Sequence, residues 1–278
     1  MIVGVVGGGV VGQAIAKSYF EFCETRVYDV QPERRTHTFD EVLAADFVFV
    51  CLPTPQKQND IGLNTDVLVK FFESLEGEQR NRNFVIRSTV PVGFTRATFD
   101  MQVPNVLHSP EFLTARCSFQ DAMMPMVNMI GSPAFGRQSE VVNALMNLYS
   151  VRFPEARTIA LTSDETELVK ILRNTFFSAK IAMLNEFRTL CDKLGVSWDD
   201  VRNAFLQDNR INSSHTQVPG PDGKRGFGGT CLPKDLSEFR AQCRASGVPA
   251  PVATAAFVRN AMDRQAKPTS GKDPGQVS

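Results

Sequence analysis

The sequence has no long apolar run, and its first residues do not have the pattern of a leader. Its apolar stretches, such as FVFVCL at residues 47–52, fall far short of the roughly 18 residues that suggest a membrane span. The first residues, MIVGVVGGG, carry neither the basic flank nor the small-residue cleavage site of a signal peptide. We therefore expect no membrane segment and a cytoplasmic location.

There is also no excess of either charge and no pairing pattern among the cysteines. Lysine plus arginine and aspartate plus glutamate each number 30, which argues against nucleic acid as the main partner. The six cysteines form no C-x-x-C pair and no histidine stands at zinc-finger spacing, so we expect neither a disulfide framework nor a metal site. Five cysteines are interpreted as small buried residues: Cys23, Cys51, Cys117, Cys191 and Cys243.

The chain is long enough for two domains, since its 278 residues exceed the roughly 100 to 150 typical of one. It opens with a strand-like apolar run, then GGGVVG, then a helix-like segment. In this order the first glycine permits a tight turn, the second lets a pyrophosphate approach the backbone, and the third lets the helix pack closely on the strand. The predicted dinucleotide contacts are Gly7, Gly9, Val10, Val11 and Gly12.

We expect the dinucleotide to be NAD. A second strand-like run contains Asp29, twenty positions after Gly9, where a carboxylate binds the adenosine ribose hydroxyls. Asp29 would repel the 2′-phosphate of NADP, whereas Arg34 offers that group a cation, so NADP stays a minority alternative. A G-x-G-x-x-G alone is merely a turn, but the strand, the helix and the distal acid together favour a nucleotide site.

Further strand-like runs alternate with helix-like segments, which is typical of a Rossmann-like, doubly wound parallel sheet. In such sheets ligands bind beyond the carboxyl ends of the strands. Pro53, Thr54, Thr89 and Glu111 follow these runs and are candidates to lie near the nicotinamide end. The plainer alternative is that Thr89 caps the next helix and that Glu111 is a solvated loop charge.

The second half is predicted to be all-helical around one long central helix. From Ser163 to Leu194 there is no glycine or proline, Thr162 to Glu165 supplies a capping box, and Gly195 ends the helix. Apolar residues recur along it every three or four positions. They are Leu168, Leu172, Phe176, Ala179, Met183, Phe187, Leu190 and Leu194.

Two polar residues on this helix are candidates for chemistry. Lys170 and Asn174 lie four apart and so share one face of the helix. Lys170 comes about two turns after the domain junction, where the pair would look into a cleft between the domains. The plainer alternative is an exposed lysine on a solvated face.

A polar loop at 209–226 leads into GFGGTCLPKD. Loops of this length inside a compact domain are usually functional. This one contains donors of the kind that hold phosphates. They are Arg210, His215, Lys224 and Arg225.

The motif after the loop contains the sixth cysteine. Pro233 suits the first turn of a helix, so Cys231 would stand at a helix N-terminus, where the dipole and Lys234 favour the thiolate. Asp235 would project on the same side and act as a base near the sulfur. A buried, inert cysteine is the plainer alternative.

Together these motifs resemble the UDP-glucose/GDP-mannose dehydrogenase family, and most of all its UDP-glucose 6-dehydrogenases. The resemblance covers residues 1–265 and rests on GVVGGGVVG, STVPVG, SPEFL, ELVKILRN, DNRINSSHTQVPGPDGKR and GFGGTCLPKD. It implies oxidation of the C6 alcohol of UDP-glucose to a carboxylate, a step of polysaccharide biosynthesis, with two NAD per sugar and a thiohemiacetal and thioester on Cys231. It also implies a homodimer built on the long helix.

The resemblance also implies roles for single residues. Lys170 and Asn174 stabilise the oxyanion at C6, Asp235 and Thr89 position or deprotonate water, and Glu111 serves in acid–base work. Arg210 reaches the sugar in a neighbouring subunit. The implied cofactor contacts add Arg34, Pro53, Thr54, Thr89 and Lys234 to the glycine motif and Asp29. The implied substrate contacts are Glu111, Phe112, Leu113, Lys170, Asn174, Arg210, Lys224, Phe227, Gly228 and Cys231.

Two departures from the family pattern stand out. The family commonly has a second glutamate where this chain has Ala115, and it continues into a third domain where this chain has only AKPTSGKDPGQVS. We therefore expect an NAD-binding domain at 1–161, a helical dimerisation and catalytic domain at 162–266, and a disordered tail at 267–278. Substrate affinity is expected to be poor unless another polypeptide supplies the missing part.

Two alternatives remain open. A β-hydroxyacid dehydrogenase shares the Rossmann-plus-long-helix plan and the Lys-x-x-x-Asn pair, but it performs one two-electron oxidation and has no use for Cys231. A non-catalytic remnant that binds NAD, or pairs with a complete partner, would explain Ala115 and the missing domain. The presence of Cys231, Lys170, Asn174 and Asp235 argues against the remnant.

Overall fold

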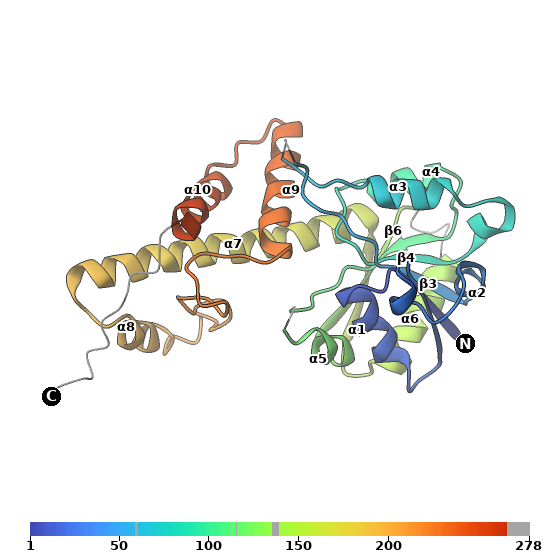
Figure 1. Ribbon diagram of the computed structural model, residues 1–278, viewed down its shortest axis with the longest axis horizontal. Coiled ribbons are helices and arrows are strands. Elements are labelled where there is room, and N and C mark those ends of the chain that lie inside the picture. The colour runs from blue at the N-terminus through green and yellow to red at the C-terminus, as the bar shows by residue number, and fades with distance from the viewer. Residues whose placement is uncertain (59–60, 115, 135–138, 266–278) are drawn as a thin grey trace. The chain divides into compact units, whose positions relative to one another are not determined.

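The computed structural model describes residues 1–58, 61–114, 116–134 and 139–265. It divides into two compact units, one formed by Met1–Ile171 and one beginning at Leu172. The first holds a sheet covered by helices, and the described part of the second is built from helices and loops (Figure 1). Ala115 and the tail at 267–278 lie outside the described residues. Among the described helices, none combines the length and hydropathy needed to cross a membrane.

In the described part of the chain, seven strands form one sheet in the order β2-β1-β3-β4-β5-β6-β7. Strands β1 to β5 pair in the parallel sense, which confirms the predicted α/β class. Strands β1, β3, β4 and β5 are almost fully buried and mostly apolar, as expected of strands covered on both faces. The strands are β1 (Ile2–Val6), β2 (Glu24–Tyr28), β3 (Phe47–Val50), β4 (Phe84–Ile86), β5 (Val106–His108), β6 (Val127–Ser132) and β7 (Arg157–Thr162).

The sheet is mostly parallel as predicted, but the two strands at one edge are reversed, which was not predicted. β6 pairs with β5 in the antiparallel sense, through His108 and Gly131, and β7 runs parallel to β6. In the described part of the β5–β6 connection the only helix is α5, of six residues. A parallel return normally runs through a longer crossover helix, whereas an antiparallel one does not need it.

Helices cover both faces of the sheet. Apolar side chains of α1 and α6 form one core with one face, and those of α2 and α3 form another with the opposite face (Figure 1). The helices of this unit are α1 (Val10–Tyr19), α2 (Phe39–Leu43), α3 (Asp66–Glu73), α4 (Phe94–Asp100), α5 (Ser118–Met123) and α6 (Ser139–Arg152), with 3-10 turns η1 (Pro32–Arg34) and η2 (Gly77–Asn81).

The long helix has the predicted bounds. α7 (Ser163–Leu194) begins with a reciprocal cap, because Thr162 N donates to Glu165 Oε2 at 2.8 Å and Glu165 N donates to Thr162 Oγ1 at 3.3 Å. Gly195, with a φ of +71°, ends it. α7 starts in the first unit and continues through the second, where α9 and α10 lie beside it (Figure 1). The remaining helices are α8 (Trp198–Phe205), α9 (Cys231–Ala245) and α10 (Pro251–Gln265).

The apolar residues that recur along α7 face outward. Seven of the eight are between 38% and 66% exposed in the described chain, and Ala179 is half-buried. The buried residues of α7 are instead mostly small or polar, such as Ser178, Ala182 and Asn185. The seven exposed residues, here termed the α7 stripe, are Leu168, Leu172, Phe176, Met183, Phe187, Leu190 and Leu194.

Candidate functional site

The glycine motif forms a tight turn between β1 and α1. Gly7 has a φ of +99°, and a Cβ on it would lie 2.6 Å from Cys51 O. A Cβ on Gly12 would lie 1.8 Å from Gly7 O, so α1 packs too closely on β1 for any side chain there. A Cβ on Gly9 would meet no atom of the described part of the chain within 4 Å. Gly7 and Gly12 are therefore required by the fold itself, whereas Gly9 leaves open space at the N-terminus of α1, as a pyrophosphate requires.

Asp29 stabilises this turn through hydrogen bonds to backbone N–H groups. Its Oδ2 accepts a hydrogen bond from Gly8 N at 2.7 Å, and its Oδ1 accepts one from Gln31 N at 2.8 Å. A carboxylate has about four acceptor sites, so both oxygens can still accept from ribose hydroxyls. Arg34 lies beside the same turn, since a Cβ on Gly8 would come within 2.8 Å of Arg34 O. These residues fit an NAD, and the bond from Gly8 to Asp29 was not foreseen from the sequence.

Replacing Gly9 by alanine is expected to weaken NAD binding at least about tenfold while lowering the free energy of unfolding by no more than about 1 kcal/mol, because the new methyl group meets only ligand. Gly12→Ala is the matched comparison. It is expected to lose about 3 kcal/mol of stability, because its Cβ overlaps Gly7 O. Denaturant unfolding and calorimetric titration with NAD measure both. A Gly9→Ala protein that binds NAD normally would contradict the assignment.

The carboxyl ends of β3, β4 and β5 carry the next candidates. Thr54 Oγ1 donates to Thr89 O at 2.7 Å, so the structure brings these two buried residues together. Pro53 beside them is exposed. The alternative in which Thr89 caps the next helix is wrong, because α4 begins at Phe94 and its N-cap is Gly93.

Glu111 and Lys170 form a buried ion pair. Lys170 Nζ donates to Glu111 Oε1 at 2.8 Å and to Glu111 O at 2.6 Å, and Leu113 N donates to Glu111 Oε2 at 2.7 Å. The ammonium also lies 5.8 Å from the centre of the Phe112 ring. With Lys170 3% and Glu111 7% exposed, the alternatives of a solvated lysine and a solvated loop charge are both wrong.

The charge state of this pair follows from its contacts. Burial raises the pKa of Glu111, but the charge and hydrogen bond of Lys170, with the Leu113 N–H, outweigh burial and leave the pKa below the ordinary 4.5. Glu111 is therefore a carboxylate at neutral pH. It holds a lysine ammonium at the carboxyl edge of the sheet, where a developing negative charge can be stabilised.

The first turns of α7 are tied to the loops that carry these candidates. Glu167 is fully buried and accepts hydrogen bonds from Gly93 N at 2.6 Å, Thr95 N at 2.8 Å and Thr95 Oγ1 at 2.5 Å. Burial raises the pKa of Glu167 to about 7, although these bonds lower it. Thr166 Oγ1 is hydrogen-bonded to His108 Nδ1 at 2.8 Å. Sequence reasoning missed Glu167; its only signal was an acid three residues before Lys170.

In the second unit, Asp235 links α7 to α9. Asn174 Nδ2 donates to Asp235 Oδ2 at 2.5 Å, and Lys234 Nζ donates to Asp235 Oδ1 at 2.6 Å. Asp235 is fully buried, whereas Cys231 is exposed as the first residue of α9, with Thr230 Oγ1 3.8 Å from its sulfur. Among the described residues, the bonded partners of Asp235 are thus Asn174 and Lys234 rather than the thiol.

The other cysteines differ in exposure from the prediction. Cys191 is buried as expected, and burial raises the pKa of the Cys51 thiol to about 12, which makes it inert. The prediction is wrong for Cys117, which is exposed because it stands at the surface before the short helix α5. Cys23 and Cys243 are half-buried.

In the polar loop, Arg210 and Lys224 are exposed, whereas His215 packs against a neighbouring ring. Arg210 is exposed and paired with Asp208, and Lys224 is exposed. His215 stacks on Phe177 with ring centroids 4.0 Å apart. Burial, and then the charges of Arg173 and Lys180, lower the pKa of His215, so the ring is neutral at neutral pH.

The residues just before α9 are used by the second unit itself. Arg225 is paired with Asp192. The Phe227 side chain is buried against Leu236 and Ala253, and Gly228 lies under the guanidinium of Arg264.

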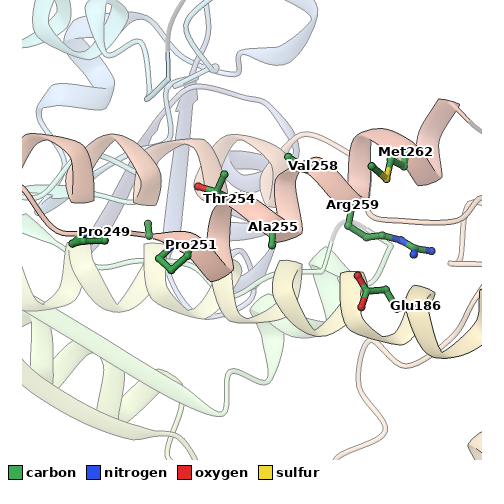
Figure 2. Close-up of a pocket in the computed structure, with 9 residues that line it drawn as sticks. Glu186, Pro249, Pro251, Thr254, Ala255, Val258, Arg259 and Met262 are labelled. Atoms are coloured by element: carbon green, nitrogen blue, oxygen red, sulfur yellow. The ribbon is translucent and has the colours of Figure 1, made fainter.

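A groove of about 750 Å³ lies away from all of these candidates (Figure 2). It runs between α10 and α7 in the second unit, with Ala255, Val258 and Met262 on α10 and Glu186 on α7. No predicted site residue lines it. We therefore locate the candidate site from the chemistry of the predicted residues and not from the volume of this groove.

Comparison with known proteins gives matches over most of the chain. The model described as the NAD binding domain of the UDP-glucose/GDP-mannose dehydrogenase family matches residues 21–151, and the model of that family's central domain matches 164–262. The first match identifies NAD as the cofactor of the first unit. UDP-glucose 6-dehydrogenase 3 of Arabidopsis thaliana is 28% identical over 220 residues, 75% of this chain and 45% of that protein. The chain thus spans about half the length of this curated relative.

Two solved structures share the fold. A UDP-glucose dehydrogenase from Pyrobaculum islandicum gives a TM-score of 0.82 at 23% identity, over 94% of this chain and 68% of that one. A 3-hydroxyisobutyrate dehydrogenase from Mycobacterium tuberculosis gives 0.71 at 18% identity, over 94% of this chain and 92% of that one. At these identities both likenesses concern the fold alone.

Proposed function

The chain belongs to the UDP-glucose/GDP-mannose dehydrogenase family, and from that membership we propose that it catalyses the NAD-dependent, four-electron oxidation of the C6 alcohol of a nucleotide sugar, with UDP-glucose as the substrate. The observation that carries the proposal is the exposed Cys231 at the first residue of α9. A two-electron alcohol oxidation needs no thiol, whereas oxidation beyond the aldehyde needs a nucleophile that turns the aldehyde into a hydride donor.

The first oxidation removes a proton and a hydride from the C6 alcohol. NAD, when bound, takes up the hydride in each of the two oxidations. Lys170 and Asn174 stabilise the negative charge that develops on the C6 oxygen. Lys170 has three donors, two of which go to Glu111, and the third serves the substrate. The product of this step is an aldehyde.

The second oxidation depends on Cys231. Its thiolate adds to the aldehyde carbon and gives a thiohemiacetal, which loses a hydride to become a thioester. Water then attacks the thioester, the carbon–sulfur bond breaks, and the carboxylate leaves as the thiolate is restored. Asp235 and Thr89 position or deprotonate this water, and Glu111 serves in acid–base work.

The remaining predicted residues hold the ligands. NAD contacts Gly7, Gly9, Gly12 and Asp29, with Val10, Val11, Arg34, Pro53, Thr54 and Lys234 around them. The sugar nucleotide contacts Phe112, Leu113, Arg210 and Lys224 and the backbone of Phe227 and Gly228. The exposure of the Arg210 and Lys224 side chains supports this role, although Arg210 Nε and Nη2 are bonded to Asp208 and would have to share those donors with the ligand.

The test is the number of NADH molecules formed per sugar. Purified protein is given excess NAD and a limiting amount of UDP-glucose, and then other nucleotide sugars. Two NADH per sugar supports the four-electron route. If no nucleotide sugar yields NADH although NAD binds, the chain is not a self-sufficient enzyme, and the proposal fails.

A two-electron β-hydroxyacid dehydrogenase is the second candidate. What favours it is the fold shared with the 3-hydroxyisobutyrate dehydrogenase, 92% of which this chain covers. That enzyme class gives one NADH per substrate and is indifferent to the thiol. One NADH with a small hydroxyacid, and none with nucleotide sugars, would select it.

We also infer that the α7 stripe forms a homodimer interface. Seven large apolar side chains along one helix are exposed, and a row of exposed apolar side chains is typical of a surface that binds a partner. Leu190→Glu, at a position 58% exposed, is expected to convert a species of twice 30.7 kDa into one of 30.7 kDa. Val151→Glu, at an equally exposed position on α6, is the control and leaves the mass unchanged. Sedimentation velocity measures both, and a wild-type monomer at high concentration contradicts the dimer.

A further inference from the structure

The start of α9 is not fixed by a cap of its own. The N-cap residue is Thr230, and its side chain makes no capping hydrogen bond. Where an N-cap side chain accepts a hydrogen bond from the first turn, it helps to fix the residue at which the helix begins. In this chain the first residue is Cys231, so whatever holds the preceding turn also decides where the sulfur lies.

That turn, Gly226 to Gly229, is held by side chains of α7 and α10. Gly226 N donates to Asn185 Oδ1 at 3.1 Å, and Phe227 N donates to Asn260 Oδ1 at 2.7 Å. Arg264 Nε donates to Phe227 O at 3.0 Å. Both the N–H and the C=O of Phe227 are therefore bonded to α10.

Two glycines of the turn allow α10 to approach closely enough to make these contacts. A Cβ on Gly226 would lie 2.4 Å from Asn260 Oδ1. A Cβ on Gly228 would lie 2.5 Å from Arg264 Nη2 and 2.8 Å from its Cζ, so the guanidinium packs directly on the backbone. Gly229, by contrast, has open space around its Cβ position. The glycines at 226 and 228 thus serve the approach of α10.

Arg264 also ties the turn to the loop before it. Its Nη1 donates to Asp222 Oδ2 at 2.6 Å, in a pair that is partly exposed. One guanidinium therefore joins the polar loop, the Phe227 carbonyl and the Gly228 backbone. A planar group with five donors in a fixed fork can do this, whereas an ammonium cannot.

We propose that Arg264 is a positioning residue for Cys231, acting through the Phe227 carbonyl and the Gly228 backbone. By fixing the turn it aims the sulfur and the first N–H groups of α9, and it thereby sets the reactivity of the thiol. The importance of this for turnover rests on the proposed function. The positioning itself does not, because thiol reactivity can be measured without substrate.

The test is the alkylation rate of Cys231 by iodoacetamide at pH 7, followed by peptide mass spectrometry. A Cys117→Ser background removes the other exposed thiol. Arg264→Ala is expected to slow alkylation about tenfold, since thiolates at helix N-termini depend on the oriented N–H groups. Added guanidinium ion is expected to restore the rate, and methylammonium is not. In turnover, the same variant is expected to lower kcat with little change in KM.

Asp222→Asn is the matched control, because it breaks the ion pair and leaves the contacts with the turn. Its alkylation rate is expected to equal that of the wild type. If it slows as much as Arg264→Ala, the ion pair is responsible and the proposal is overturned. If Arg264→Ala unfolds, Arg264→Lys keeps the charge without the fork and is expected to show the same slow alkylation; a wild-type rate there also overturns it.

The two proposals fail separately. A wild-type protein that forms no NADH, while Arg264→Ala still slows alkylation, contradicts the proposed function and supports the positioning role. If the wild type forms two NADH per sugar and Arg264→Ala leaves the alkylation rate and kcat unchanged, the proposed function is supported and the positioning role of Arg264 is contradicted.

Discussion

Replacing Cys231 by serine is expected to stop the reaction at the aldehyde, with one NADH formed per sugar in place of two. A hydroxyl at this position is a far weaker nucleophile than a thiolate, so the second oxidation should slow by at least about 10³-fold. The first oxidation relies on other groups and should continue. The number of NADH formed per sugar in a stopped assay measures the extent of oxidation, and a hydrazide reagent that traps the aldehyde shows where the reaction ends.

Cys117→Ser is the control for this experiment, because Cys117 is the other exposed thiol. It is expected to leave two NADH per sugar. Should the Cys231→Ser protein still form two NADH per sugar at the normal rate, no covalent intermediate on this residue takes part in the reaction.

Replacing Lys170 by methionine is expected to cost about 3–5 kcal/mol of unfolding free energy at pH 8, because it leaves the carboxylate of Glu111 buried without its cation. The same variant should lose about 10²-fold or more in the rate of the first oxidation, since the oxyanion loses a donor. Lys180→Met, on the same helix and more exposed, is the control and should cost about 1 kcal/mol or less.

The cost at Lys170 has a distinctive pH dependence. In the wild type the pKa of Glu111 lies below 4.5, so the stabilisation from the pair is present above that pH and is lost as pH falls through the folded value. In Lys170→Met, burial outweighs the remaining favourable contacts and raises that pKa above 4.5, so the variant loses stability as pH rises. The difference between the two proteins should therefore shrink from pH 8 to pH 4.

Denaturant unfolding at several pH values tests this dependence. The double variant Lys170→Met/Glu111→Gln should recover a large part of the lost stability, since no unpaired charge remains. A pH-independent cost, or no recovery in the double variant, would show that the pair matters only through packing.

The features that the sequence predicted well are those with local causes. α7 has the predicted bounds because its cap, Thr162 to Glu165, and its terminator, Gly195, act within a few residues. The turn at Gly7 to Gly12 is likewise a property of one short segment. The strands were found from their apolar runs, but an apolar run carries no direction, so the reversal of β6 and β7 was not predicted.

The features that were missed depend on residues far apart in the chain. Glu167 bonds to the loop at Gly93, 74 positions away, and Arg264 bonds to Phe227, 37 positions away. A single sequence gives no signal for such pairs. The error at Cys117 has another cause, because the average burial of cysteine says nothing about one that stands just before a short helix at the surface.

The contrast between Gly9 and Gly12 bears on the history of this chain. A lineage that had stopped binding a dinucleotide would be free to let Gly9 drift to other small residues, since no atom of the described residues lies within 4 Å of a Cβ at that position. It would not be free to change Gly12, which the fold needs with or without a ligand. The tolerance of each glycine to substitution therefore separates selection for folding from selection for the cofactor, within one turn of a single helix.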